Sequence, residues 1–439
     1  MRRYNYWILG LIVCSFYQCQ SVTTNEPGLA NPEFYHHSVK KLSDIIVYDI
    51  FSPPVASRNY AYPNIAAYEV LAALDDSYLS LANQITNFTA GPSVPEGEVS
   101  TAVAALEAFI ITAKHFIFSE QKLISYQEEL HKQLREQGIS KKVFKNSVAY
   151  GTAMAEHIIA YSDGDNYKQS RTFPKYAVSS DPALWKPTPP GYMDGIEPHW
   201  RDIRSFVLDS ANQFVPHPPT PFDMTKGSKF YEETMEVYNI VANETEETKE
   251  IASFWDCNPY VLNVTGHVMH ATKKITPGGH WIGITALACE KANADLATTI
   301  KAYTLTSIAL ADGFISCWDE KYRSNLVRPE TVINEYIDED WIPTLQTPPF
   351  PEHTSGHSVI SRAAAVVLTS IFGDDFSFDD TVELEYGLPV RSFNSFYAAS
   401  DEAAISRLYG GIHYKPAIDY GVSQGEKVGK LILERIRMN

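Results

Sequence analysis

Three short segments in the C-terminal half of the chain combine basic side chains with histidine. The first is "WDEKYRSNLVRP", in which Lys321 and Arg328 are seven residues apart. Seven residues make nearly two turns of a continuous helix, so both cations would share one face. Pro329 disfavours helical geometry at the residue before it, so we expect Arg328 to lie where the helix ends. Two cations at this spacing can flank an anion, although a solvated helix face shows the same pattern.

The second segment, "PPFPEHTSGHSVISR", spans residues 348–362 and predicts a loop that turns into a helix. Thr354 and Ser355 are good N-cap residues, and Gly356 would let a ligand approach the backbone closely. The first amides of a helix carry partial positive charge and bind anions. Ser355 would add a hydroxyl group, and His357 could exchange a proton. Taken alone, the segment also fits an ordinary capped helix.

The third segment, "ISRLYGGIHYKPAID", holds Arg407 and His413, which are six residues apart. On an unbroken helix these side chains would lie about 240° apart and could not converge. Gly410 and Gly411 supply a break that would let them point together. A lone histidine in this position would otherwise be a buried core residue.

Together the three segments predict a cradle for a tetrahedral oxyanion, with one histidine to move protons and a second to act as nucleophile or ligand. The order Lys-x6-Arg-Pro, Ser-Gly-His and Ser-Arg-x5-His resembles the signature of type 2 phosphatidic-acid-phosphatase-like acid phosphatases and vanadium-dependent haloperoxidases. The matching residues are Lys321, Arg328, Ser355, Gly356, His357, Arg407 and His413.

Two positions depart from that signature. Thr354 stands where the family usually has proline, which is a conservative change in a loop. Ala417 stands where the family has an aspartate that orients the second histidine, and the nearest aspartate, Asp419, comes two residues later. This departure puts the family's hydrogen bond to His413 in doubt, and Asp419 is the alternative residue that could supply it by another path.

The resemblance implies one of two chemistries. In a haloperoxidase, His413 would be the single protein ligand of orthovanadate, and Lys321, Arg328, Arg407, Ser355 and the Gly356 amide would hold its oxygens. His357 would take the proton of hydrogen peroxide, Lys321 would polarise the oxygen that the halide attacks, and hypohalous acid would form. In a phosphatase acting on phosphate monoesters, His413 would attack phosphorus and His357 would protonate the leaving alcohol.

Several features favour the haloperoxidase. Its members are long helical proteins, and no apolar run of membrane-spanning length follows the N-terminus here. Trp318 and Phe350 occupy positions where chloride-type members carry halide-pocket aromatics, whereas bromoperoxidases tend to have histidine at the second position. Core packing is the alternative role for both aromatics. A third possibility, a binding protein that captures an oxyanion without turnover, would not need two histidines.

Other residues near the motifs carry weaker signals. In "FWDCNP" the resemblance makes Asp256, or a residue one or two places away, the candidate to orient the catalytic histidine, and a plain structural role is the alternative for Asp256. His267 and His270 are three residues apart and would share a helix face for metal binding, with His280 further along the chain, but no acidic or cysteine partner has an evident ligand spacing. Cys257, Cys289 and Cys317 are too few and too sparse for a disulfide framework, so we expect buried, free thiols.

Helical periodicity dominates the chain from about residue 39 to the end, and no series of alternating strands appears. We therefore predict an all-α fold, a large helical bundle, as one domain over residues 39–439 with the active site at about 250–425. The N-terminal half carries no chemistry that we can name, and we expect it to cover the active site or to form a homodimer interface. The formal net charge of -17 argues against nucleic acid as a partner, so any bound anion needs a local basic cluster.

The N-terminus, "MRRYNYWILGLIVCSFYQC", has two arginines followed by an apolar run. This layout predicts a secretory signal over residues 1–19, either of the ordinary type or of the lipoprotein type with Cys19 modified, and then a polar linker over 20–38. We expect an exported protein that is periplasmic, anchored to the outer membrane or secreted. A lipid on the N-terminus would be its contact with the membrane.

Overall fold

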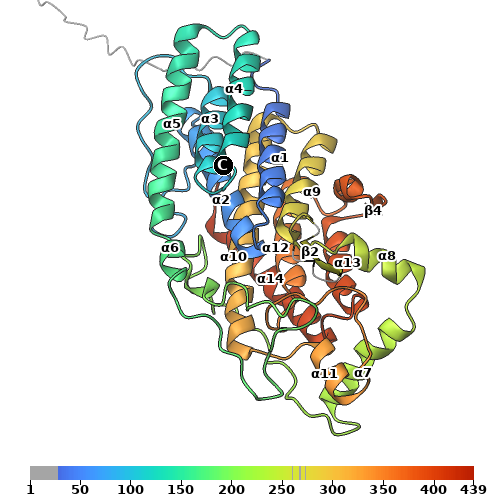
Figure 1. The fold of residues 1–439 in the computed structure, drawn as a ribbon. Helices are drawn as coiled ribbons and strands as arrows, with labels where there is room; N and C mark the ends of the chain where they lie inside the picture. The colour runs from blue at the N-terminus through green and yellow to red at the C-terminus, as the bar shows by residue number, and fades with distance from the viewer. Residues whose placement is uncertain (1–27, 260, 266–267, 272) are drawn as a thin grey trace, which may run out of the picture.

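The computed structural model describes residues 28–259, 261–265, 268–271 and 273–439. It is an elongated, mostly helical molecule (Figure 1), as the sequence predicts. The N-terminal helices lie at one end, α7 and α11 lie at the other, and α10 runs between them. The α-helices are α1 (Glu33–Tyr48), α2 (Pro53–Leu74), α3 (Thr101–Lys114), α4 (Glu120–Glu136), α5 (Lys141–Asp163), α6 (Tyr167–Ser170), α7 (Lys229–Ala242), α8 (Glu246–Phe254), α9 (Pro277–Lys291), α10 (Leu296–Ser324), α11 (Pro329–Tyr336), α12 (Gly356–Phe372), α13 (Phe396–Tyr409) and α14 (Lys415–Arg435).

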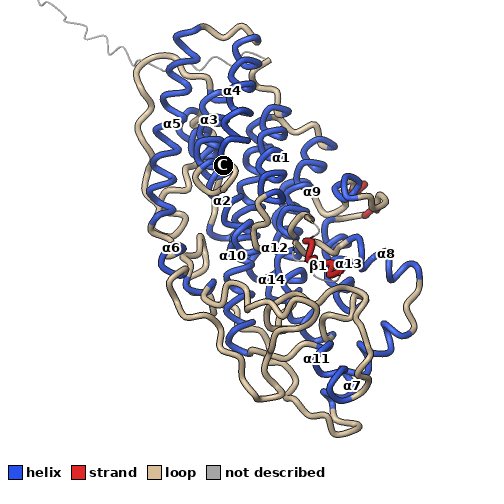
Figure 2. Tube along the Cα trace, in the orientation of Figure 1, coloured by secondary structure: helices blue, strands red, loops and turns tan. Residues whose placement is uncertain are grey.

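Strands are short and lie to one side of the helices (Figure 2). Two antiparallel hairpins form, β1 (Leu262–Thr265) with β2 (Val268–Ala271) and β3 (Phe378–Asp380) with β4 (Arg391–Phe393). The 3-10 helices are η1 (Trp200–Asp202) and η2 (Val382–Tyr386). The long, proline-rich connection between α6 and α7 has η1 as its only helix among the described residues, because proline lacks an amide donor and ends helices.

Burial differs strongly between outer and inner helices. In α4 the buried residues are Leu123, Leu130 and Leu134, a single apolar stripe on an otherwise polar helix. By contrast, α10 is buried on nearly every side over its 29 residues. It packs against α2 in the N-terminal half and against α12 and α14 in the C-terminal half. The helix that ends near Lys321 is therefore held by both halves of the chain.

The C-terminal segment returns to the N-terminal helices (Figure 1). The carbonyl oxygen of Met438 accepts hydrogen bonds from the Tyr68 hydroxyl group at 3.0 Å and from the Leu79 amide at 2.9 Å. One hydrophobic core includes residues from Leu29 to Met438. This packing joins the first helices to α14, which in turn packs on α12.

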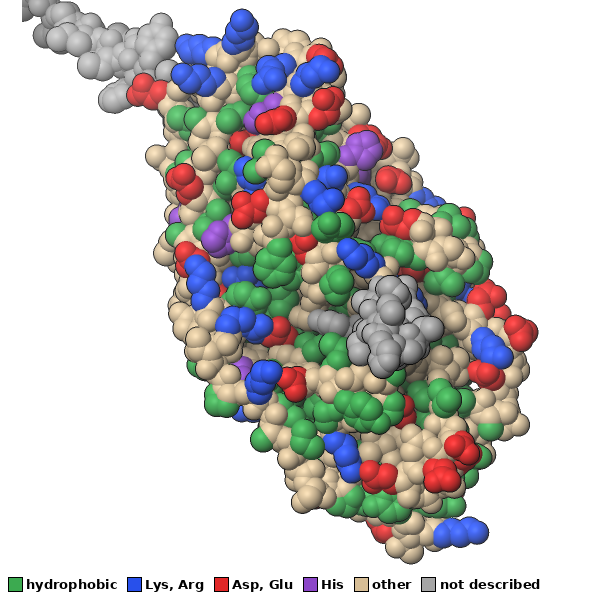
Figure 3. Space-filling view, viewed as in Figure 1, with side chains coloured by type: hydrophobic (Ala, Val, Ile, Leu, Met, Phe, Trp, Pro, Cys, Tyr) green, Lys and Arg blue, Asp and Glu red, His purple; other side chains and the backbone are tan. Residues whose placement is uncertain are grey.

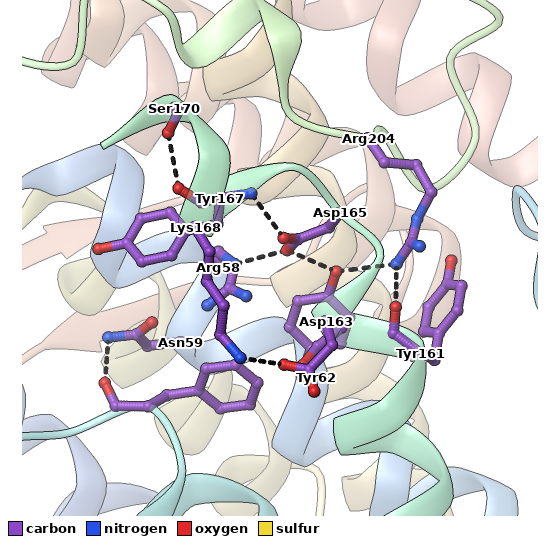
Figure 4. Close-up of polar contacts among 12 residues, drawn as sticks. Arg58, Asn59, Tyr62, Tyr161, Asp163, Asp165, Tyr167, Lys168, Ser170 and Arg204 are labelled. Atoms are coloured by element: carbon purple, nitrogen blue, oxygen red, sulfur yellow. Dashed lines mark hydrogen bonds and ion pairs between the residues drawn. The ribbon is translucent and has the colours of Figure 1, made fainter. Parts of the chain in front are cut away.

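A buried ionic cluster fixes the junction of α2, α5 and α6 (Figure 4). Asp165 accepts hydrogen bonds from Arg58 Nε at 2.6 Å, the Tyr62 hydroxyl group at 2.9 Å and the Tyr167 amide at 2.9 Å. The Arg58 guanidinium also lies 4.4 Å from the centre of the Tyr167 ring. Arg204 extends the cluster by donating to the Tyr62 hydroxyl group at 3.0 Å. A buried charge held this way is stable only while its partners remain in place.

The structure corrects one prediction about the N-terminal region and does not describe the residues of another. The predicted linker over 20–38 is too long, because α1 already begins at Glu33. The predicted leader over 1–19 and Cys19 lie outside the described residues. No helix in the described part of the chain is both long and apolar enough to cross a membrane.

Candidate active site

The basic residues of the three motifs converge because the helices end where the sequence predicts breaks. Helix α10 ends at Ser324, and Arg328 is the N-cap of α11 in an extended conformation with φ −79° and ψ 151°. Helix α13 ends at Tyr409, and Gly411 has a φ of +73°, which a residue with a side chain rarely adopts. The turn at Gly411 brings His413 to Arg328, with 3.1 Å between His413 Nε2 and Arg328 Nη1.

Ser355 is the N-cap of α12, as the sequence predicts, and its hydroxyl oxygen accepts from the Ser358 amide at 3.3 Å. Its own amide donates to the carbonyl oxygen of Ala417 at 3.0 Å. Gly356 is the first residue of the helix, and a Cβ there would meet the Trp318 ring at 3.6 Å. The helix N-terminus therefore packs directly against one of the two predicted pocket aromatics.

The segment 350–355, which we call the active-site loop, holds the cations with its backbone. The carbonyl oxygen of Phe350 accepts from Arg328 Nε at 2.9 Å. Lys321 Nζ donates to the carbonyl oxygens of Pro351 at 2.9 Å and Glu352 at 3.0 Å. An ammonium group has three donors, so these two bonds leave one for a ligand. The loop thus sets the positions of both cations of the first motif.

His413 is held in one tautomer. Its Nδ1 lies 2.7 Å from Glu352 Oε1, and its Nε2 lies 3.1 Å from Arg328 Nη1. A guanidinium group only donates, so Nε2 accepts and the proton lies on Nδ1, which donates to Glu352. Burial and the positive charges of Arg328 and Lys321 lower the pKa of His413 well below its usual value. His413 therefore presents a neutral nitrogen lone pair, the form that ligates a metal or attacks phosphorus.

Glu352 is the functional residue that the sequence analysis missed. Asp419, the alternative candidate for the hydrogen bond to His413, does not supply it, because Asp419 is an exposed residue that pairs with Lys415. Glu352 takes the place instead, and the same carboxylate oxygen also accepts from the Tyr414 amide at 3.0 Å. In the sequence, Glu352 could have been noticed only as a single acidic residue in a proline-rich loop, three places before Ser355.

The prediction that Asp256 orients the catalytic histidine was also wrong. Asp256 pairs with Lys274 at 2.6 Å. His357 Nε2 instead donates to the carbonyl oxygen of Trp255 at 3.0 Å, which leaves Nδ1 as the acceptor. Burial, followed by the charge of Arg407, lowers the pKa of His357 well below its usual value. His357 is therefore a neutral imidazole with a free lone pair, suited to accept a proton.

The site concentrates buried positive charge. The side chains of Lys321 and Arg328 are fully buried, and Arg407 is nearly so. Arg407 donates to the Ser406 hydroxyl group at 2.9 Å and to the Ala252 carbonyl oxygen at 3.3 Å. Burial lowers the pKa of Lys321 to about 7 and that of Arg328 to about 10. An anion bound among these cations would offset the cost of their burial.

The residues present fit orthovanadate or phosphate. Arg328 Nη2 is a buried donor with no partner within the described structure, which points to a missing acceptor. The remaining donors are a lysine, a second arginine and the start of a helix, all suited to a tetrahedral oxyanion. His413 adds the neutral imidazole nitrogen.

A pocket with a volume of about 40 Å³ opens onto the histidines. The predicted site residues in its wall are Trp318, Phe350, Gly356, His357, Arg407 and His413. Trp318 and Phe350 pack with ring centres 4.9 Å apart, and Lys321 Nζ lies 5.0 Å from the centre of the Phe350 ring. The indole N–H of Trp318 donates to the Ile196 carbonyl oxygen at 3.1 Å. Trp318 and Phe350, which we call the aromatic wall, therefore present ring carbon atoms to the pocket.

The positive charge of the site is internal. On the face drawn in Figure 3, acidic and basic side chains are interspersed and form no broad basic surface. This arrangement agrees with a net charge of -17 in a protein that still builds a local anion site.

The fold and the site together indicate a helical enzyme that binds an oxyanion, with His357 placed to accept a proton and His413 placed to act as a ligand or nucleophile. A bacterial vanadium-dependent iodoperoxidase of known crystal structure is 52% identical, with a TM-score of 0.88, and the match covers 93% of this chain and 97% of that one. The chain therefore belongs to the vanadium-dependent haloperoxidase family.

Other comparisons agree on the fold. The family model described as the VCPO second helical-bundle domain matches residues 334–439. Two structures of a bacterial vanadium-dependent chloroperoxidase, apo and holo, are 16% and 15% identical with TM-scores of 0.66 and 0.64. Those matches cover 88% and 94% of this chain and 94% and 95% of the other chains. No curated protein sequence matches. As a family member the chain is a peroxidase that uses vanadate and oxidises halide with hydrogen peroxide, and the phosphatase alternative is disfavoured.

Proposed function

We propose that the chain is an iodide-oxidising peroxidase in which His413 holds vanadate and the three buried cations, Lys321, Arg328 and Arg407, neutralise its oxygens. The observation that carries the assignment is the neutral Nε2 of His413, 3.1 Å from Arg328 in a buried pocket. Bound vanadate would act as a Lewis acid that activates hydrogen peroxide. The protein would supply position and charge, which are the larger part of such catalysis.

His357 would move the proton. Its Nδ1 carries the free lone pair, because Nε2 donates to the Trp255 carbonyl oxygen. A base within the pocket can accept the proton that hydrogen peroxide releases and later return it to the product oxygen. Lys321 would polarise the oxygen that the halide attacks, using the one donor that the loop carbonyls leave. Ser355 and the Gly356 amide would hold further oxygens at the start of α12.

Iodide as the preferred halide is supported by the 52% identity to a protein described as an iodoperoxidase. Trp318 and Phe350 do not discriminate between halides, because chloride-type members carry aromatics at the same two positions. The indole N–H of Trp318 donates to the Ile196 carbonyl oxygen, so it serves the protein rather than the halide. The sequence alone had left the halide open.

Phosphate-free apoprotein tests the proposal directly. Oxidation of iodide, bromide and chloride by hydrogen peroxide is measured with and without orthovanadate, beside hydrolysis of an aryl phosphate. We expect vanadate-dependent oxidation with iodide first, and its loss in His413→Ala. Chloride oxidation as fast as that of iodide would contradict the halide assignment. Vanadate-inhibited phosphate hydrolysis would favour the phosphatase, and turnover retained in His413→Ala would contradict the site.

We also propose export, supported by the arginines and the apolar run of residues 1–19. Fractionation of cells expressing the full chain should place the mature protein outside the cytoplasm, and mass spectrometry would detect a lipid on Cys19. An N-terminus that begins at Met1 in the purified protein would contradict this proposal. Homodimer formation through the N-terminal half stays a prediction, which light scattering would test.

A further inference from the structure

Three side chains with metal-binding atoms meet beside the active site, outside the oxyanion cradle. Cys257 follows α8, His280 lies in the first turn of α9, and Glu383 lies in η2. All are buried, with exposed fractions of 1%, 0% and 4%. The sequence offered no partner for His280, because Glu383 comes from a hairpin about a hundred residues further on. His267 and the side chain of His270 lie outside the described residues.

The distances between the three ligand atoms are those of a tetrahedral site. His280 Nδ1 lies 3.5 Å from Cys257 Sγ and 3.1 Å from Glu383 Oε1, and Cys257 Sγ lies 3.7 Å from Glu383 Oε1. Typical bonds of zinc to sulfur, nitrogen and oxygen at tetrahedral angles would place the same atoms about 3.4 to 3.6 Å apart. The three atoms need to move by only a few tenths of an ångström to share one ion.

The fourth residue of the cluster holds the other side of the imidazole. His280 Nε2 lies 2.8 Å from Asp380 Oδ2, and Asp380 is itself fully buried. Histidines that ligate zinc commonly donate their second nitrogen to a carboxylate, which fixes the tautomer and orients the ring. With Nε2 bound to Asp380, Nδ1 faces Cys257 and Glu383.

We propose that Cys257, His280 and Glu383 bind one zinc ion, with Asp380 as the hydrogen-bond partner of His280. A thiolate, an imidazole and a carboxylate form a donor set that suits zinc, and the fourth position is left for water. This site is separate from the vanadate cradle and does not depend on the proposed halide chemistry.

Zinc binding would help to fix the position of His357, the histidine that we propose moves protons. The Trp255 ring stacks on His280, with ring centres 4.6 Å apart and planes 20° apart. The carbonyl oxygen of the same tryptophan accepts from His357 Nε2. Cys257 also lies in the wall of the active-site pocket, which gives the ion a route of entry. A zinc ion would tie the segment after α8 to α9 and to the β3–β4 hairpin.

Metal analysis of the full-length protein tests the proposal without any measurement of activity. Tag-free protein is dialysed against a chelator, titrated with zinc in the absence of vanadate and analysed for bound metal. We expect one zinc per chain in the wild type and in Cys289→Ala, whose cysteine is buried elsewhere. We expect none in Cys257→Ala and at least tenfold weaker binding in Glu383→Gln, which keeps the side-chain volume.

Cobalt gives a second readout, because a thiolate bound to Co²⁺ produces a charge-transfer band in the near ultraviolet. The band should appear in the wild type and in Cys289→Ala and be absent in Cys257→Ala. Circular dichroism checks that each variant is folded. If Cys257→Ala is not folded, the zinc affinity of Glu383→Gln tests the proposal instead. A wild type that binds no zinc, or variants that bind as much as the wild type, would overturn the proposal in favour of a metal-free ionic cluster.

Discussion

Glu352 should control how tightly the protein holds vanadate. The carboxylate accepts the Nδ1 proton of His413 at 2.7 Å and so keeps Nε2 free as a ligand. Glu352→Gln retains a carbonyl oxygen that can accept the same bonds, but it removes the negative charge that raises the basicity of the imidazole. Glu352→Ala also removes the acceptor for the Tyr414 amide.

Changes to such partners of metal-binding histidines typically cost 10- to 100-fold in metal affinity. We therefore expect about a tenfold rise in the vanadate dissociation constant for Glu352→Gln, or about 1.4 kcal/mol. Loss of both hydrogen bonds places Glu352→Ala near the upper end, about 100-fold, or about 2.7 kcal/mol. Glu352 Oε2 has no partner within the described structure, so the amide of glutamine adds a buried unpaired group and lowers stability by about 1 to 3 kcal/mol.

The assay reconstitutes apoprotein with increasing vanadate and follows both bound vanadium and peroxidase activity. Asp419→Asn is the matched control, since it removes the carboxylate that the family signature points to but that pairs with Lys415 here. We expect its affinity for vanadate to equal that of the wild type. Equal affinities in all the Glu352 variants, or an equal loss in Asp419→Asn, would refute the reasoning.

Three further predictions concern stability and the pocket wall. Asp165→Ala leaves Arg58 buried without its partner and should lower the free energy of unfolding, measured by urea titration, by about 3 to 5 kcal/mol. Asp163→Ala, which removes one partner of an exposed ion pair, is the control and should lower that free energy by at most about 1 kcal/mol. Asp312→Ala leaves three buried backbone amides without an acceptor and should lower the free energy of unfolding by at least about 3 kcal/mol. In a urea titration, the midpoint should fall while the slope of the unfolding free energy against urea concentration stays unchanged. Trp318→Phe should cost about 1 kcal/mol of stability and leave the KM for iodide unchanged in steady-state kinetics, because its N–H is used within the protein; a raised KM would show that the indole binds the halide.

Local features of the sequence predicted much of the fold and of the cradle. The helical periodicity from about residue 39 onward predicted the all-α fold, because helices that pack in a core bury apolar faces at regular spacing. The positions of Arg328 and Ser355 followed from Pro329 and from N-cap chemistry, which act within a few residues.

The errors in the site were long-range. Glu352 reaches His413 only because the turn at Gly411 folds the chain back against the active-site loop, and no local pattern reports that contact. Asp256 was chosen for its position in the sequence, but a backbone carbonyl of Trp255 does the work, and any residue type could supply a carbonyl group. The convergence of Cys257, His280 and Glu383 likewise depends on tertiary packing, so ligand spacing along the chain could not reveal it.

The active-site loop has a consequence for the rate at which the apoprotein becomes active. Its backbone carbonyls already fix Lys321 and Arg328, its Glu352 carboxylate fixes His413, and its Ser355 caps α12. Little ordering remains to be done when the anion arrives, so the entropic cost of binding is small. Activation should therefore proceed in a single phase whose rate rises in proportion to vanadate concentration, limited by entry through the pocket rather than by a rearrangement of the chain.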